Sequence, residues 1–512
     1  MSIPPGHPAE DSPASASSHP YSDASPVLPT DRRLPKWLIL FKPKVGIPLA
    51  ILIVLVSIPL AIRNWRISSL PQIDEPFDIE AFCSVTIPDD DNAFVEYREA
   101  FDLFVEFRGK NNDWESYKEL LKGKWNDVPP AFPAWIKSND RAFHAWLDGT
   151  AKPGAMFMPR RDLSYSAIDY TDTARSLIRV AMLRAGRNLH DGNTAEAWKI
   201  LHAAFRFSRH VGQNGPTIER HTGIAILPLV CTGLLSWAHH ANTTARDLEH
   251  AIAILPDEFA SMTPLYSETL KHEYLAEQDF LRDSGPRLRI FTNLPAIDSG
   301  LIFVLGEPEF SLTLLDLHLA NQVAGIDLTP SARPKLIAGD ARIFDIPAVP
   351  GKTISGVDLQ HLLSRVSVTT VGGGGLPWMS HSIYALNLER TFESTMIAVL
   401  SIEYYVRKHA RFPSSLAEFP ESCAKALFAD PLHSSSGNII YRAAENFSVV
   451  YGLGEDGFDD GHRVAPPERD EQASWDRLDD SRGRFEGYRI PLWRPASADD
   501  KAASVESDNV QD

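Results

Sequence analysis

The stretch "YTDTARSLIRVAMLRAGRNLHDGNTAEAWKILHAAFRFSRH", residues 170–210, predicts two helices joined by a short turn. Apolar residues recur at steps of three and four in its first half, namely Tyr170, Ala174, Leu177, Ala181, Ala185 and Leu189. These steps place side chains on one face of a helix, so we expect that face to be buried. Ala181 is expected to pack against the second helix.

The turn "HDGN" ends the first helix, and the second helix has an apolar face of its own. Asn193 and Glu196 have the spacing of a capping pair at its start. The expected buried face consists of Ala197, Ile200, Leu201, Ala204, Phe205 and Ser208. Two neighbouring helices with apolar faces predict a helical hairpin.

Further helices are predicted on both sides of this hairpin. One begins at Asn92, with Asp90 or Asp91 as its cap, and others span about 217–239 with a kink at Pro228, 264–283 and 387–410. The stretch "ALFADPLHSSSGNIIYRAAENFSVVYGLG", residues 426–454, is typical of two short strands joined by a turn. The predicted fold class is therefore mainly α, with helical hairpins, a small C-terminal β element and one N-terminal transmembrane helix.

The transmembrane helix is predicted from "VGIPLAILIVLVSIPLAI", residues 45–62, which contains no charge. At ~1.5 Å rise per residue it spans ~27 Å, close to the hydrocarbon thickness of a bilayer. A retained anchor is favoured over a cleaved signal peptide because no small-residue cleavage site follows it. The bases Arg32, Arg33, Lys36, Lys42 and Lys44 precede it, and only Arg63 and Arg66 follow immediately. This asymmetry predicts a cytoplasmic N-terminus, with the larger part of the chain outside the cell membrane.

Changes in composition divide the chain into seven predicted segments. They are a disordered cytoplasmic tail at 1–31, the anchor with its flanks at 32–66, an extended stalk at 67–91, a helical domain at 92–285, an irregular Gly- and Pro-rich region at 286–386, a helix with a β element at 387–465 and an acidic segment at 466–512.

The overall charge and the cysteine content exclude several classes of protein. A net charge of −17 argues against a nucleic-acid partner, because phosphate binding needs a basic surface. The three cysteines, Cys83, Cys231 and Cys423, lie far apart and have no zinc-binding spacing. We expect three buried thiols, with one long-range disulfide as the alternative.

The run 403–461 contains, in order, "EYYVRKHARFPSSLAEF", "DP", "GNIIYR" and "FSVVYGLGEDGFDDG". This order resembles the C-terminal part of type II secretion major pseudopilins, in which the final loop binds calcium. The resemblance implies Asp456, Asp459 and Asp460 as calcium ligands. "IPDDDNAFVEYREA", the second helix of the hairpin and this tail together resemble membrane-anchored proteins of unknown function from planctomycete bacteria. That second resemblance implies no activity.

The acidic loop also has an explanation without a metal. Counted from Asp456, an EF-hand would need an oxygen ligand at Phe458 and a glutamate at Pro467, so that motif fails. Glycines permit positive φ and aspartates favour turns, so an acidic turn accounts for the composition by itself. The sequence leaves open both the turn and the calcium site, and it predicts no other cofactor.

Several acidic and histidine residues have spacings that place them on one face of a predicted helix. They are Glu268 with His272, Glu273 with Glu277, and Glu389 with Glu393. Converging carboxylates and a histidine are able to bind a metal or transfer protons. Such pairs also arise on solvated helix faces, so exposed ion pairs are the favoured interpretation. His239, His240 and His250 fall near a helix end, where a cationic or capping role is expected.

No residue pattern identifies a reaction, and no catalytic residue is assigned. The leading hypothesis is a single-pass membrane-anchored protein whose extracytoplasmic domain is an interaction or structural module, with the lipid bilayer and unidentified proteins as partners. The alternative is an extracytoplasmic hydrolase or metal-dependent enzyme without a recognisable motif.

Overall fold

Most of the chain that the computed structural model describes is α-helical, which confirms the predicted mainly α fold. The described residues are 43–68, 75–110, 116–126, 128–161, 170–284, 309–327, 377–415, 418–419, 439–443, 447–451 and 488–491. The helices are α1 (Pro43–Ser68), α2 (Ile79–Cys83), α3 (Ala93–Leu103), α4 (Tyr117–Leu121), α5 (Ala131–Ser138), α6 (Asp140–Thr150), α7 (Tyr170–His190), α8 (Thr194–Gly212), α9 (Thr217–His239), α10 (Ala245–Met262), α11 (Tyr266–Ser284), α13 (Glu309–Gly325) and α15 (Pro377–His409). The strands are β1 (Ile440–Ala443), β2 (Phe447–Tyr451) and β3 (Tyr488–Pro491).

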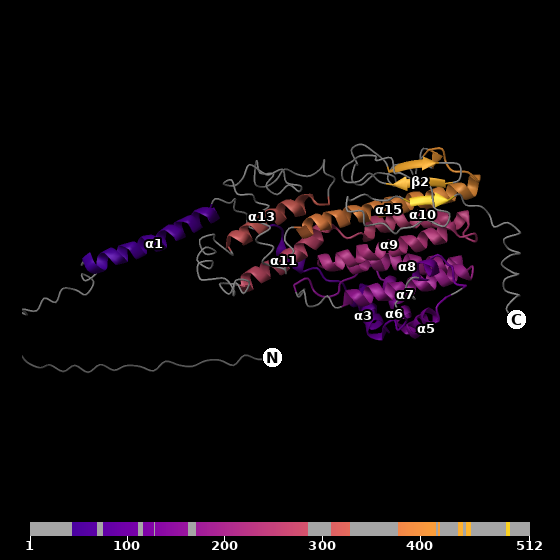
Figure 1. The fold of residues 1–512 in the computed structure, drawn as a ribbon, viewed down its shortest axis with the longest axis horizontal. Coiled ribbons are helices and arrows are strands. Elements are labelled where there is room, and N and C mark those ends of the chain that lie inside the picture. The colour runs from indigo at the N-terminus through magenta and orange to yellow at the C-terminus, as the bar shows by residue number, and fades with distance from the viewer. Residues whose placement is uncertain are drawn as a thin grey trace, which may run out of the picture. The chain divides into compact units, whose positions relative to one another are not determined.

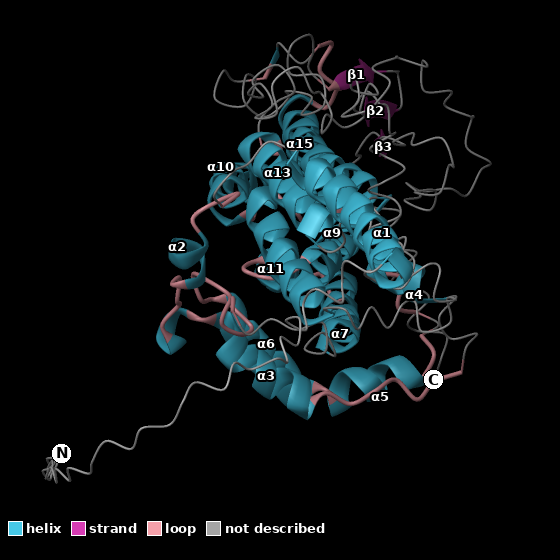
Figure 2. Ribbon diagram, turned by 90° about the vertical axis from the view of Figure 1, so that its left-hand side faces the viewer, coloured by secondary structure: helices cyan, strands magenta, loops and turns pink. Residues whose placement is uncertain are grey.

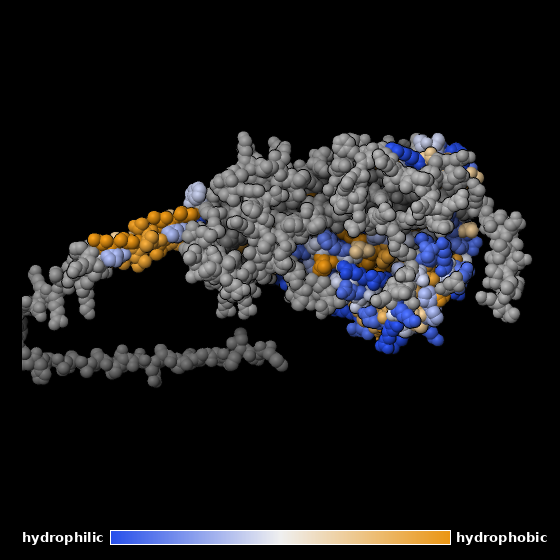
Figure 3. All heavy atoms as spheres, viewed as in Figure 1, coloured by the Kyte–Doolittle hydropathy of each residue, from blue (hydrophilic) through white to orange (hydrophobic). Residues whose placement is uncertain are grey.

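The chain divides into two compact units, Met1–Ala61 and Ile62–Asp512. Helix α1 supplies the described residues of the first unit, and its large apolar side chains are exposed, as Figure 3 shows. By length and composition, both the Gly46–Trp65 part of α1 and helix α9 are apolar enough to cross a membrane. They differ in packing, because none of the span in α1 is buried whereas 61% of α9 is. Helix α9 is therefore a core helix of the second unit.

In the second unit, helices α7, α8 and α9 lie side by side, and α10 and α15 pack next to α8 and α9 (Figure 1). The strands pack on α15, on the opposite side of the bundle from α3, α5 and α6 (Figure 2). One hydrophobic core includes side chains from helices α3 to α10, from α15 and Val450 of β2. The predicted segments 92–285 and 387–465 thus share a core.

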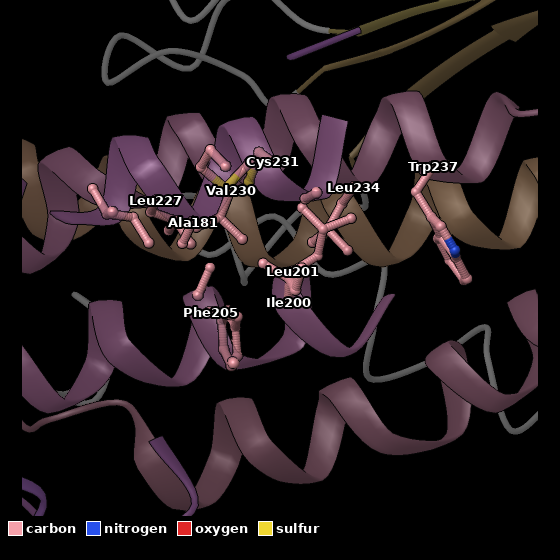
Figure 4. Packing of buried hydrophobic residues seen from close by; sticks show 14 of the residues in the cluster. Ala181, Ile200, Leu201, Phe205, Leu227, Val230, Cys231, Leu234 and Trp237 are labelled. Carbon is pink, nitrogen blue, oxygen red and sulfur yellow. The ribbon is translucent and has the colours of Figure 1, made fainter. Parts of the chain in front are cut away.

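The helical hairpin is confirmed as helices α7 and α8. Every residue expected on either apolar face is buried, including Ala181, which Figure 4 shows among the core side chains. The break between the helices falls at "HDGN", where Gly192 has a φ of +78°. The expected capping pair is wrong in detail. Asn193 is the cap residue but its side chain makes no capping hydrogen bond, and Glu196 instead pairs with Lys199.

The cap of α3 is Asn92 rather than Asp90 or Asp91, which belong to a 3₁₀ turn at Asp89–Asp91. The Oδ1 atom of Asn92 accepts hydrogen bonds from the backbone N–H of Phe94 at 3.1 Å and of Met156 at 2.9 Å. Its amide also donates to the carbonyl of Met156. Asn92 therefore both caps α3 and attaches the loop after α6.

The helices predicted at 217–239 and 264–283 correspond to α9 and α11, but three other features differ from the prediction. Helix α10 was not expected, although a capping box between Thr244 and Asp247 opens it. Helix α15 begins about ten residues before the predicted position, at Pro377. Helix α13 lies within the region predicted to be irregular. Apolar residues occur on all sides of "EFSLTLLDLHLANQVAG", so this helix lacks the periodicity that predicts an amphipathic helix.

Part of the segment predicted as an extended stalk is folded. Phe82 of α2 is buried, and its ring packs edge-to-face with Phe77 and with His272 of α11. Phe77 also packs against Tyr274, in a second apolar cluster formed mainly by α11 and α13. Of the two cysteines that the structure describes, Cys231 is buried in the main core and Cys83 is half-buried, so the expectation of buried thiols fails at Cys83.

The β element contains the two predicted strands and a third. The order is β1-β2-β3 with both pairs antiparallel, and Ile440 lies opposite Tyr451 while Phe447 lies opposite Pro491. Strand β3 comes from the predicted acidic segment 466–512, whose charged composition gives no signal for a strand. The chain thus returns to the sheet near its C-terminal end.

Candidate functional site

Two arginines and two glutamates form a buried ionic cluster where α8, α9 and α15 meet. Arg209 lies in the last turn of α8, Arg220 lies near the start of α9, and Glu389 and Glu393 are one turn apart on α15. Arg209, Arg220 and Glu389 are at most 1% exposed, and Glu393 is 15% exposed. This ionic cluster is the most deeply buried group of charges among the described residues.

Glycines allow the two arginines to come together. Gly223 of α9 lies against the backbone carbonyl of Ser208 in α8, where a Cβ atom would overlap that oxygen. Gly212 of α8 lies against the side chain of Arg220, and a Cβ atom at Gly212 would be only 3.1 Å from the Arg220 Cδ atom. Helices approach closely where small residues face each other, so these glycines bring the end of α8 next to the start of α9.

Glu389 is the centre of the ionic cluster. Its Oε1 atom accepts hydrogen bonds from Arg209 and, at 2.8 Å, from Arg220, and its Oε2 atom accepts a second bond from Arg220. Glu393 accepts hydrogen bonds from Arg209 at 2.7 Å and from the hydroxyl of Thr263 at 2.8 Å. The planar guanidinium group suits such multiple contacts with carboxylates.

The charges in the ionic cluster balance, because two cations meet two carboxylates. Burial raises the pKa of Glu393, and the negative charge of Glu389 acts in the same direction against the attraction of Arg209. Buried charges are tolerated when they are paired in this way, and removal of one partner is costly. Both oxygens of Glu389 are already occupied by arginine, so the ionic cluster is suited to joining helices rather than to binding a substrate.

The expectation of exposed ion pairs is therefore wrong for Glu389, which is paired but fully buried. The spacing of Glu389 and Glu393 correctly places both on one helix face. Their arginine partners lie 169 to 184 residues away in the sequence. One feature of the sequence indicated buried partners for these glutamates. Arg209 and Arg220 lie beside strongly apolar stretches of α8 and α9.

The residues singled out on α11 do not join the ionic cluster. Glu268 pairs with Lys271 at 2.5 Å and with Arg160 at 3.2 Å. His272 is 2% exposed, and neither ring nitrogen has a hydrogen-bond partner among the described residues. Burial, with smaller contributions from Arg160 and Lys271, lowers the pKa of His272 to about 3. His272 is thus a neutral core side chain, and the expected solvated face is wrong here.

Glu273 has a capping role. It is buried, and its Oε1 atom accepts a hydrogen bond at 2.6 Å from the backbone N–H of Thr217, the first residue of α9. A carboxylate at a helix N-terminus satisfies a free N–H group and interacts favourably with the helix dipole. Asp327 acts similarly on α11, because it accepts bonds from the N–H groups of Tyr266 and Ser267. The side chain of Glu277 lies outside the described residues.

The cationic or capping role expected for the three histidines stays a prediction, and they lie in different surroundings. His239 Nδ1 lies 3.2 Å from Glu403 of α15, so this histidine has an ionic partner. His240 Nδ1 accepts a hydrogen bond from the N–H of Asn242 in the turn that follows α9. His250 is exposed on α10. These three side chains do not combine into a metal site in the part of the chain that is described.

One arrangement of polar side chains was not anticipated. His202 Nε2 of α8 lies 2.6 Å from an oxygen of Glu258 in α10, and Arg206 donates to the other oxygen at 3.0 Å. The ring of His202 stacks on Trp198 with an interplanar angle of 8°. Burial alone would raise the pKa of Glu258, but the hydrogen bonds and charges of His202 and Arg206 outweigh it and lower that pKa.

The half-buried group of His202, Glu258 and Arg206 resembles an acid–base pair held in place by an arginine. Arg206 also donates to the carbonyls of Thr150 at 2.6 Å and Lys152 at 2.9 Å, so it ties the end of α6 to α8 and α10. The spacing of His202 and Arg206 in the sequence places both on one face of α8. No sequence pattern indicates that α8 packs against α10, so the partner Glu258 was not predicted.

The predicted calcium ligands Asp456, Asp459 and Asp460 lie outside the described residues. The structure describes only the strands on either side, β2 and β3. The calcium site and the acidic turn therefore both stay as predictions. Comparison with known protein families, with curated proteins and with solved structures gives no match for this chain.

Proposed function

We propose that this protein is anchored in the cell membrane by α1 and that its helical body is an extracytoplasmic interaction or structural module. The observation that carries the proposal is the exposure of α1. Large apolar side chains such as Leu55, which is 63% exposed, cover the helix on all sides. Such a surface is costly in water and is stable in hydrocarbon.

The length of the exposed apolar segment supports a single crossing. The segment Gly46–Trp65 has no side chain buried in the protein, and at ~1.5 Å per residue it is ~30 Å long. This length matches the hydrocarbon core of a bilayer. The five bases before the segment and two after it favour a cytoplasmic N-terminus.

The use of the buried charges favours a module over an enzyme. Glu389 and Glu393, which an acid–base mechanism would require to be accessible, hold α15 to α8 and α9. Glu273 caps α9. The converging carboxylates therefore hold helices together. This use is expected in a protein whose rigid body presents a binding surface to partners.

The enzyme alternative draws on a different observation, the half-buried pair of His202 and Glu258. A carboxylate that orients an imidazole is a common part of a general base. If the alternative holds, His202→Gln will abolish hydrolysis of some ester, peptide or glycoside in a substrate panel and leave the melting temperature within a few degrees. If the wild-type protein is inactive on every substrate of the panel, the result favours the interaction or structural module.

Protease accessibility tests the topology. Protease added to intact spheroplasts is expected to degrade the body, residues 67–512, and to spare the N-terminal tail. Inverted membrane vesicles serve as the matched control, because there the tail is cut and the body is protected. Protection of the body in spheroplasts would overturn the proposed orientation.

Binding to partners is tested by purification of the whole protein in mild detergent. A partner of the module should be retained by the wild-type protein and by His202→Gln. The same partner should be lost from Ala181→Glu, whose bundle is disrupted. Equal recovery with Ala181→Glu would show that the partner recognises α1 or the tail instead of the folded body.

A further inference from the structure

Glu219 is a fully buried carboxyl group without an ionic partner among the described residues. It is the third residue of α9 and is 1% exposed. Neither of its oxygens makes a hydrogen bond of ordinary geometry with a described group. A charged carboxylate in such a place is strongly disfavoured, so burial selects the protonated acid.

The immediate surroundings of Glu219 are glycine and aromatic rings. A Cβ atom at Gly215 would overlap the Glu219 carboxyl group, so the turn before α9 is closed directly over the acid. On the α7 side lies Tyr170, which stacks with Phe101 and contacts Phe94. The hydroxyl of Tyr170 interacts with the acid, but its oxygen is also buried without a hydrogen bond of ordinary geometry.

The charged groups on the neighbouring elements are engaged elsewhere. On α9 and α8, Arg220 and Arg209 bind Glu389 of α15. On α7, Arg175 bonds to Asp172 and to Thr222.

Three further titratable groups on elements that pack against α9 also have partners of their own. Glu273 of α11 caps Thr217. His210 of α8 is bonded to Tyr97. Glu119 of α4 has two lysine partners. The energy of an ionised Glu219 is thus not offset by a neighbouring cation.

Burial raises the pKa of Glu219 to about 8, and the opposing effect of Tyr170 is smaller. The acid is therefore mainly protonated at neutral pH and loses its proton just above it.

We propose that Glu219 is a proton-operated latch that keeps the first turn of α9 packed against α7 only while its carboxyl group is protonated. Ionisation draws the side chain toward water and opens the turn at Asn214–Thr217. Two contacts depend on that turn, the hydrogen bond from Arg160 to Asn214 at 2.5 Å and the cap that Glu273 places on Thr217. Deprotonation therefore loosens α11 and the loop after α6 together. This inference concerns regulation and does not depend on the proposed function.

The latch predicts the sign of the pH dependence. The native state holds a proton that the unfolded chain releases near pH 4.5, the ordinary value for glutamate. The contribution of Glu219 to the free energy of unfolding is therefore full below pH 4.5, falls as the pH rises to about 8 and is constant above that. Local opening of the turn increases in the same direction.

Hydrogen exchange of the whole protein in detergent tests the proposal. Protection of peptides that cover residues 214–220, corrected for intrinsic exchange, is expected to fall about tenfold per pH unit between about pH 5 and pH 8 and to level off above pH 8. Glu219→Gln keeps a neutral side chain of the same size and should show no such fall. Glu196→Gln is the matched control, because Glu196 is the third residue of α8 but its side chain is 50% exposed. It should retain the wild-type fall.

A fall of equal size in Glu219→Gln, or a flat profile in the wild type, overturns the latch. If Glu219→Gln does not fold, Glu219→Met is used, and infrared spectroscopy of the wild type gives a second test. The carbonyl band of a protonated carboxyl group must be present at pH 6.5 and lose intensity between pH 7 and 9. Its absence at pH 6.5 also overturns the proposal.

Discussion

The interface between α7 and α8 and the junction of α8 and α9 with α15 differ in the side chains that they bury. The first is formed by small and aliphatic residues such as Ala181 and Leu201, which are close in the chain and follow one helical period. The second is formed by Arg209, Arg220 and Glu389, which are distant in the chain. An apolar side chain packs against many other apolar side chains, whereas a buried charge requires an opposite charge. The second region therefore determines that α15, and no other helix, packs on α8 and α9.

The largest effect is expected from a charge placed in the apolar interface. Ala181→Glu adds bulk and an unpaired carboxylate to a site that is fully buried, and should destabilise the protein by more than about 4 kcal/mol. Chemical denaturation in detergent measures this. Ala195→Glu, on the exposed side of α8, is the control and should change stability by less than about 0.5 kcal/mol. A melting temperature unmoved by Ala181→Glu would refute the hairpin interface.

Removing the central carboxylate of the ionic cluster should have the next largest effect. Glu389→Gln leaves two buried arginines with one carboxylate and is expected to cost about 3–5 kcal/mol. The informative comparison replaces all four charges, as Arg209→Met, Arg220→Met, Glu389→Leu and Glu393→Gln. That variant should recover most of the loss, because apolar groups of similar volume often replace buried ion pairs without penalty. A loss below about 1 kcal/mol for Glu389→Gln would mean that the charges are not essential to the junction.

Two glycines of α9 allow a smaller and sharper test. A Cβ atom at Gly223 meets the backbone carbonyl of Ser208, which is unable to move aside, whereas one at Gly233 meets the flexible ends of Leu201 and Met182. Both substitutions to alanine gain up to about 1 kcal/mol of helix propensity. We expect Gly223→Ala to destabilise by about 1–3 kcal/mol and Gly233→Ala to be near neutral in denaturant titrations. Equal effects would contradict the close approach of α8 and α9.

The smallest effect is expected at an exposed ion pair. Glu196→Gln removes the partner of Lys199, 2.7 Å away on the surface of α8, and should cost less than about 0.5 kcal/mol. That cost should decline as salt is added, because exposed charges are screened. The cost of Glu389→Gln should be nearly independent of salt. If the cost of Glu389→Gln changed with salt, water and ions would have access to the ionic cluster.

Local pattern predicted much of this fold because the apolar faces of α7 and α8 repeat at the helical period. Helix α13 was missed because its apolar residues lie on all sides. Strand β3 was missed because it lies in a strongly charged segment.

The candidate site was predicted only in part. The sequence placed Glu389 and Glu393 on one face, but their burial depends on arginines from two other helices. No sequence pattern singles out Glu219, and only the tertiary structure shows that Gly215 and Tyr170 enclose it. Periodicity is a local property, whereas the pairing of a charge is not.

The separation between Arg209 and Glu389 has a consequence for biosynthesis. Arg209 precedes its partner by 180 residues, so at roughly 5–20 residues per second it is synthesised roughly 9 to 36 s before Glu389. During that interval the nascent α8 and α9 carry two cations without their central carboxylate. A growing chain in this condition is expected to keep the pair of helices open and available to chaperones. The arrival of α15 then completes the bundle late in translation, as a final assembly step.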